Sequence, residues 1–123
     1  MKNKLFFLFS LVLVLLFCIT LVSCNPYGSG GPYTVRYLIT GPQSIADTIS
    51  YFNETGNLNS ITNVPIPWEK TILVQGFHSG VGCSATIPYN NGSTYTAKVF
   101  INGKESYSST SSANYVSVTG ITQ

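Results

Sequence analysis

Beyond residue 32 the chain alternates apolar and polar side chains in short runs, and this period of two limits the fold more than any other feature. Over residues 33–40, Val35 and Ile39 would share one face of an extended strand, with Arg36 and Leu38 on the other. Comparable runs recur over residues 46–53, 58–64, 70–75, 80–87, 95–101, 105–108 and 113–120. Because no run shows a helical period, the sequence predicts an all-β domain, an antiparallel β-sandwich of seven to eight strands.

Residues typical of turns and chain breaks separate these runs. Asn102-Gly103 is the strongest signal, because this pair favours the type I′ hairpin turn, in which both central residues have positive φ. Pro65 and Pro67 cannot donate ladder hydrogen bonds, so their segment should lie at a sheet edge or cross between sheets. The serine-rich residues 108–112 favour a polar loop.

The first part of the chain has a different character, that of an export signal. Two lysines close to the start precede residues 5–22, an almost entirely apolar run of 18 residues. The run leads into two aliphatic residues, a small residue and a cysteine: Leu21, Val22, Ser23 and Cys24. These four residues resemble a bacterial lipobox.

The lipobox resemblance implies that signal peptidase II cleaves between Ser23 and Cys24 and that Cys24 carries lipid, with acyl chains such as palmitate. Several chains are needed for stable anchoring, because each buried CH₂ contributes only about 0.8 kcal/mol and one chain binds weakly. An uncleaved membrane anchor is the open alternative, since 18 apolar residues approach the roughly 17–25 that span a bilayer. Either way the rest of the chain lies outside the cytoplasm, attached to a membrane.

Three segments follow from this interpretation. Residues 1–23 form a lipoprotein signal peptide, and residues 24–32 form the lipidated Cys24 with a flexible tether rich in Gly and Pro. Residues 33–123 form the β domain. The 100 residues that follow the signal suit one domain with a modest core and are too few for two. The expected location is the bacterial cell envelope, in the periplasm or at the cell surface.

The balance of charge argues against a nucleic-acid partner. Two of the six Lys and Arg residues, Lys2 and Lys4, belong to the signal, so the mature part would hold four cationic and four anionic residues. A formally neutral domain offers no basic face for phosphates.

The chemistry-bearing residues are too few for an enzyme. Cys83 would be the single cysteine of the mature domain besides Cys24, and its apolar surroundings predict a small buried side chain. His78, the one histidine, lies five residues away and would point to the other face of a strand. One His and one free Cys fall short of a zinc site, and nothing brings Asp47 and His78 together with a serine nucleophile. We therefore expect no catalytic residue, no metal and no cofactor.

Several motifs together resemble the MmpS family of mycobacterial membrane proteins. The similar pieces keep the family's order and spacing over residues 33–120, and the Pro-Trp-x-Lys element is the most specific. They are residues 33–41, Ile49-Ser50-Tyr51, Pro65-Ile66-Pro67-Trp68-Glu69-Lys70-Thr71, Cys83-Ser84-Ala85 and Phe100-Ile101-Asn102-Gly103-Lys104.

The MmpS resemblance implies a small Ig-like β-sandwich outside the cytoplasm, held by an N-terminal membrane segment. It also implies an accessory role beside an RND-type transporter of lipids or siderophores. Mycobacterial members carry a transmembrane helix where this chain shows a lipobox, and the position before Lys98, where many of them have a cysteine, is Ala97. Trp68 is expected to be a core anchor or a partner contact.

Two function classes remain open. The first, favoured by the resemblance, is a non-catalytic accessory lipoprotein that binds another envelope protein or a transporter. The second is a surface module that binds glycan or lipid through exposed aromatic residues. The candidates for those aromatic contacts are Tyr89, Tyr95, Tyr107 and Tyr115.

Overall fold

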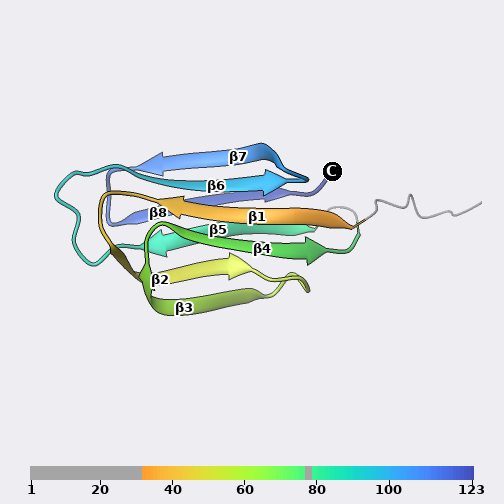
Figure 1. Cartoon of the computed structure of the whole chain (residues 1–123), viewed down its shortest axis with the longest axis horizontal. Helices are drawn as coiled ribbons and strands as arrows, with labels where there is room; N and C mark the ends of the chain where they lie inside the picture. Colours follow the sequence, from red (N-terminus) through yellow and green to blue (C-terminus); the bar gives the residue numbers. More distant parts are fainter. Residues whose placement is uncertain (1–31, 77–78) are drawn as a thin grey trace, which may run out of the picture.

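The computed structural model describes residues 32–76 and 79–123, which form eight β-strands and no helix (Figure 1). The strands are β1 (Tyr33–Thr40), β2 (Ile45–Phe52), β3 (Leu58–Pro65), β4 (Trp68–Val74), β5 (Gly80–Thr86), β6 (Tyr95–Ile101), β7 (Lys104–Ser111) and β8 (Tyr115–Ile121). This confirms the predicted all-β class. The predicted signal peptide, its cleavage site between Ser23 and Cys24, and most of the predicted tether lie outside the described residues.

The strands pack as two antiparallel four-stranded sheets, and their order explains why the domain is a sandwich (Figure 1). One sheet has the order β4-β1-β6-β7, and the other has the order β3-β2-β5-β8. Only β2–β3 and β6–β7 are hairpins of consecutive strands, while every other connection passes from one sheet to the other. Most strand pairings therefore join residues far apart in the sequence.

The core lies between the sheets and takes one side chain from every second position of the central strands. On β1 these are Val35, Tyr37 and Ile39, all fully buried, which confirms the face predicted from the alternation. The opposing sheet contributes Ile49 and Cys83 among others. Burial of apolar area contributes about 25 cal/mol per Å², so this alternating pattern is the main source of stability.

The β6–β7 hairpin turns at Asn102-Gly103 as predicted. Both residues have positive φ, 51° and 82°, and Ile101 pairs directly with Lys104 across the two-residue turn. The turn is also bound to β1, because the amide of Asn102 donates to the Thr34 carbonyl at 2.8 Å. The Thr34 amide in turn donates to Asn102 Oδ1 at 3.0 Å.

Strand β7 corrects one prediction. Residues 108–111 do not form a polar loop but continue the strand, pairing Ser108 with Lys98 and Ser111 with Tyr95. The backbone of β6 supplies ladder partners along this whole length, and short hydroxyl side chains are tolerated at an exposed sheet edge.

The proline-containing segment confirms the expected edge and crossover. Pro65 ends β3 at the edge of one sheet, and Trp68 begins β4 at the edge of the other. The link between them contains a cis Ile66-Pro67 peptide bond. Trp68 is half-buried, packs against the core, and has its ring centroid 5.4 Å from that of Tyr51. The structure thus places it as a peripheral core residue.

On the opposite side of the sandwich, Tyr107 on β7 connects the two sheets. Its hydroxyl donates to the Ile121 carbonyl at 2.8 Å and accepts from the Ile121 amide at 3.3 Å. A Cβ on Gly120 would lie 2.2 Å from the Tyr107 ring, so only glycine leaves room for the aromatic side chain there. Tyr107 thereby satisfies backbone groups on the free edge of β8.

Candidate functional site

The four tyrosines named as candidate contacts for glycan or lipid differ in their exposure. Tyr95 is fully buried in the core, so its assignment as a surface contact was wrong. The alternation of β6 already placed it on the inward face with Ala97 and Val99. Tyr107 is half-buried against β8, whereas Tyr89 and Tyr115 are 69% and 53% exposed.

Cys83 is a buried core residue, as expected from its surroundings. It lies on β5, is 4% exposed and forms no disulfide. Burial raises the pKa of its thiol to about 12, because desolvation disfavours the thiolate. A thiol that stays protonated at neutral pH is a poor nucleophile.

Other candidates for chemistry do not come together in the part of the chain that the structure describes. His78 falls outside the described residues. Among residues 32–76 and 79–123, no group of three or more His, Cys, Asp or Glu side chains could hold a metal ion. Nor do these residues include a helix long and apolar enough to cross a membrane.

The most distinctive surface is the outer face of the β3-β2-β5-β8 sheet, where the strand register aligns hydroxyl side chains in rows. Ser60 pairs with Ser50, Ser50 with Ser84, and Ser84 with Ser117, so one serine row crosses all four strands. Ser50 Oγ and Ser60 Oγ are hydrogen-bonded at 2.7 Å. We call this alignment the serine row.

Larger side chains flank the serine row on both sides. Toward one end of the strands, Leu58 pairs with Phe52 across β3 and β2. Toward the other end, a second row ends in an aromatic residue and consists of Thr62, Thr48, Thr86 and Tyr115. Serine side chains between bulkier neighbours leave a trough that runs across the strands.

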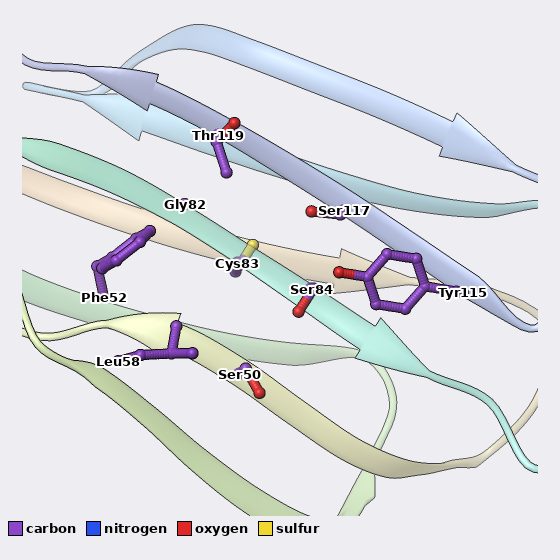
Figure 2. Close-up of a pocket in the computed structure, with 9 residues that line it drawn as sticks. All are labelled: Ser50, Phe52, Leu58, Gly82, Cys83, Ser84, Tyr115, Ser117 and Thr119. Atoms are coloured by element: carbon purple, nitrogen blue, oxygen red, sulfur yellow. The ribbon is translucent and has the colours of Figure 1, made fainter.

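A hollow of about 170 Å³ occupies this trough (Figure 2). Its lining includes Phe52 and Leu58 at one side and Tyr115 at the other, and Figure 2 shows the Tyr115 hydroxyl directed toward Ser84. Gly82 lies in the floor, where a Cβ would approach the Val118 carbonyl oxygen to 2.6 Å. The hollow is smaller than the roughly 300–1,000 Å³ of small-molecule pockets, so it suits part of an elongated ligand.

The two outer faces of the sandwich differ sharply in charge. The face of the β4-β1-β6-β7 sheet carries the ion pairs Arg36–Glu69 at 3.0 Å and Lys98–Glu105 at 2.8 Å. The Arg36 guanidinium also lies 3.9 Å from the centroid of the Phe100 ring. No charged side chain lines the trough on the other face.

The trough can therefore form hydrogen bonds and contact apolar parts of a ligand. Cys83 also lines the hollow, but burial keeps its thiol protonated, and the lining holds no Asp, Glu, His, Lys or Arg. Residue type indicated Tyr115 as a candidate contact, but it gave no reason to single out Ser50, Ser84 and Ser117. Their alternation with buried residues marks them as outward-facing, yet only the pairing of distant strands aligns them.

No family model matches the chain, and no curated protein shows a significant match.

Proposed function

We propose that this chain is a lipid-anchored protein of the bacterial cell envelope that acts as a non-catalytic binding or accessory subunit. The observation that carries the proposal is the order of its segments: an apolar run, the lipobox-like Leu21–Cys24, a short Gly- and Pro-rich tether, and a β domain beginning at Tyr33. Lipid on Cys24 would keep the domain at the membrane surface, since two or three acyl chains make release negligible.

The tether sets how far the domain can reach. Residues 25–32 would behave as a flexible chain with a root-mean-square length of about 15 Å, from the usual 5–6 Å times the square root of the residue number. A partner would therefore lie in or close to the same membrane. The resemblance to MmpS proteins makes an RND-type transporter the first partner to test.

Substitution of the cysteine tests the anchor. We expect Cys24→Ala to accumulate as a precursor that retains residues 1–23 and takes up no labelled palmitate. A matched Cys18→Ala variant removes a cysteine upstream of the cleavage site and should mature normally. Processing and labelling of Cys24→Ala as in the wild type would contradict the proposal.

Crosslinking in the native membrane tests the accessory role. A tagged lipoprotein should recover an envelope protein, identified by mass spectrometry, that cells with the untagged protein do not yield. Recovery of lipid and bulk envelope protein alone would remove the transporter partner from the proposal.

A further inference from the structure

We propose that the trough on the β3-β2-β5-β8 face binds a neutral glycan chain laid across the strands. This inference concerns the domain surface and does not depend on lipidation of Cys24 or on a transporter partner. The trough is lined by hydroxyl and aromatic side chains, carries no charged side chain and is open to solvent.

Hydroxyl groups supply both hydrogen-bond donors and hydrogen-bond acceptors along the trough. Ser50, Ser84 and Ser117 line the hollow from three neighbouring strands, and each hydroxyl can both donate and accept. Neighbouring strands lie about 4.8 Å apart, so these groups recur at a short, regular spacing. A polyhydroxylated chain presents donors and acceptors repeatedly along its length and can match such a series.

The absence of charge selects for a neutral ligand. The trough lining contains no cation to hold a phosphate, sulfate or uronate group and no carboxylate to hold a basic peptide. The charged residues of β2 and the following turn, Asp47 and Glu54, are acidic and do not line the hollow. Their field would repel an anionic polymer further.

The rims suit the less polar faces of sugar rings. Tyr115 presents an exposed aromatic ring at one side of the hollow, and Phe52 with Leu58 presents apolar surface at the other (Figure 2). Sugar rings carry C–H groups on their faces and hydroxyls at their edges, so a ring can rest on Tyr115 while its edge reaches the serines. The hollow is too small to enclose a ligand, which favours a polymer lying in it over a small molecule buried within it.

The test uses the lipidated full-length chain in nanodiscs, titrated by calorimetry with chitotetraose, cellotetraose and mannotetraose, and with the acidic tetragalacturonate. We expect at least one neutral oligosaccharide to bind and the acidic one not to bind. Tyr115→Ala should weaken binding about tenfold, and Ser84→Lys, which places bulk and charge in the trough, should abolish it.

Two controls match these variants away from the trough. Leu73→Ala removes an exposed apolar side chain from β4 in the other sheet, and Thr96→Lys adds a lysine to the outer face of that sheet. Both variants should bind within about twofold of the wild type. Thermal unfolding of each variant is compared with that of the wild type, so that loss of binding caused by misfolding can be recognised. If Ser84→Lys fails to fold, Ser117→Lys on the edge strand β8 replaces it.

Three results would overturn the glycan proposal: no neutral oligosaccharide binds, binding survives charge in the trough, or only tetragalacturonate binds. A dimer in light scattering that Ser84→Lys dissociates would assign the trough to a second copy of the chain instead. Unprocessed Cys24→Ala precursor in detergent should still bind the oligosaccharide, which keeps this test separate from that of the anchor.

Discussion

At the residue scale, two buried titratable side chains make the stability of the folded domain depend on pH. Tyr37 is fully buried, and its hydroxyl donates to the Phe52 carbonyl at 3.0 Å. Burial raises its pKa to about 12, as it does for the Cys83 thiol. Both groups are neutral in the folded domain over a range in which an unfolded chain would ionise them.

We expect the domain to lose stability as pH rises from about 9 to 12. In that window the unfolded state releases the Cys83 and Tyr37 protons while the folded state keeps them, so alkali favours unfolding. The measurement is urea denaturation at pH 8, 9, 10 and 11, with Cys83→Ala and Tyr37→Phe as variants. Each variant should lessen the dependence on pH, and an unchanged slope in both would contradict the assignment.

Cys83 should also report on opening of the core. We expect a thiol reagent at pH 8 to leave it unmodified in the folded domain and to modify it rapidly in urea, because the folded thiol is buried and protonated. The measurement is mass spectrometry of the Cys24→Ala, Cys18→Ala double variant, in which Cys83 is the remaining cysteine. Rapid modification without urea would show that the site is open.

The inward position of Cys83 could be predicted from sequence, because its neighbours alternate between small or apolar and polar residues. Tyr95 follows the same rule, and we expected it to be exposed only because tyrosine also occurs in sugar sites. For Tyr95, residue type alone led to the wrong prediction of exposure, whereas the alternation along the strand indicated the correct inward position.

At the element scale, the β6–β7 turn depends on backbone conformation. Gly103→Ala should destabilise the domain by about 1 kcal/mol, because alanine is strained at the observed φ of 82°. Gly80→Ala is the control, since a Cβ there meets no atom within 4 Å and its φ is not in the left-handed region. Thermal unfolding measures both variants, and equal losses would contradict the conformational explanation.

Tyr107 should stabilise the edge of β8 through its hydroxyl. Tyr107→Phe keeps the ring beside Gly120 but removes both hydrogen bonds to Ile121, and we expect a loss of about 1 kcal/mol in the free energy of unfolding. Tyr89→Phe, at an exposed position, should change it little. Hydrogen exchange at the Ile121 amide should rise in Tyr107→Phe alone.

Strand positions were largely predictable because alternation and turn residues are local signals. The Asn102-Gly103 hairpin and the break at Pro65–Pro67 were both recognisable from a few residues. The extension of β7 through Ser111 was not, since a serine-rich segment becomes a strand only where a partner such as β6 offers ladder hydrogen bonds.

At the scale of the whole molecule, electrostatics contribute little to stability. The described residues contain two ion pairs, both partly exposed, on one outer face. We expect the free energy of unfolding to change by less than about 1 kcal/mol between low salt and 1 M NaCl. Urea denaturation at the two salt concentrations measures this, and a larger decrease would show that charge stabilises the fold.

The sandwich class could be predicted from sequence, but the trough could not. Hydrophobic alternation says which side chains point outward and gives no information on which strands become neighbours. Ser50 and Ser117 are aligned only because β2 and β8 both pair with β5, a consequence of several crossovers between the sheets. Such non-local register needs the three-dimensional structure.

The two ends of the described chain meet, and this bears on how the protein can be handled. The Tyr33 hydroxyl donates to the Gln123 carbonyl at 2.9 Å, and β1 begins at the end of the sandwich where the chain also finishes (Figure 1). A fluorescent protein or affinity tag fused after Gln123 would be crowded against whatever holds the N-terminus. Insertion beside the exposed Tyr89, in the β5–β6 connection at the far end, would leave a label accessible to antibodies.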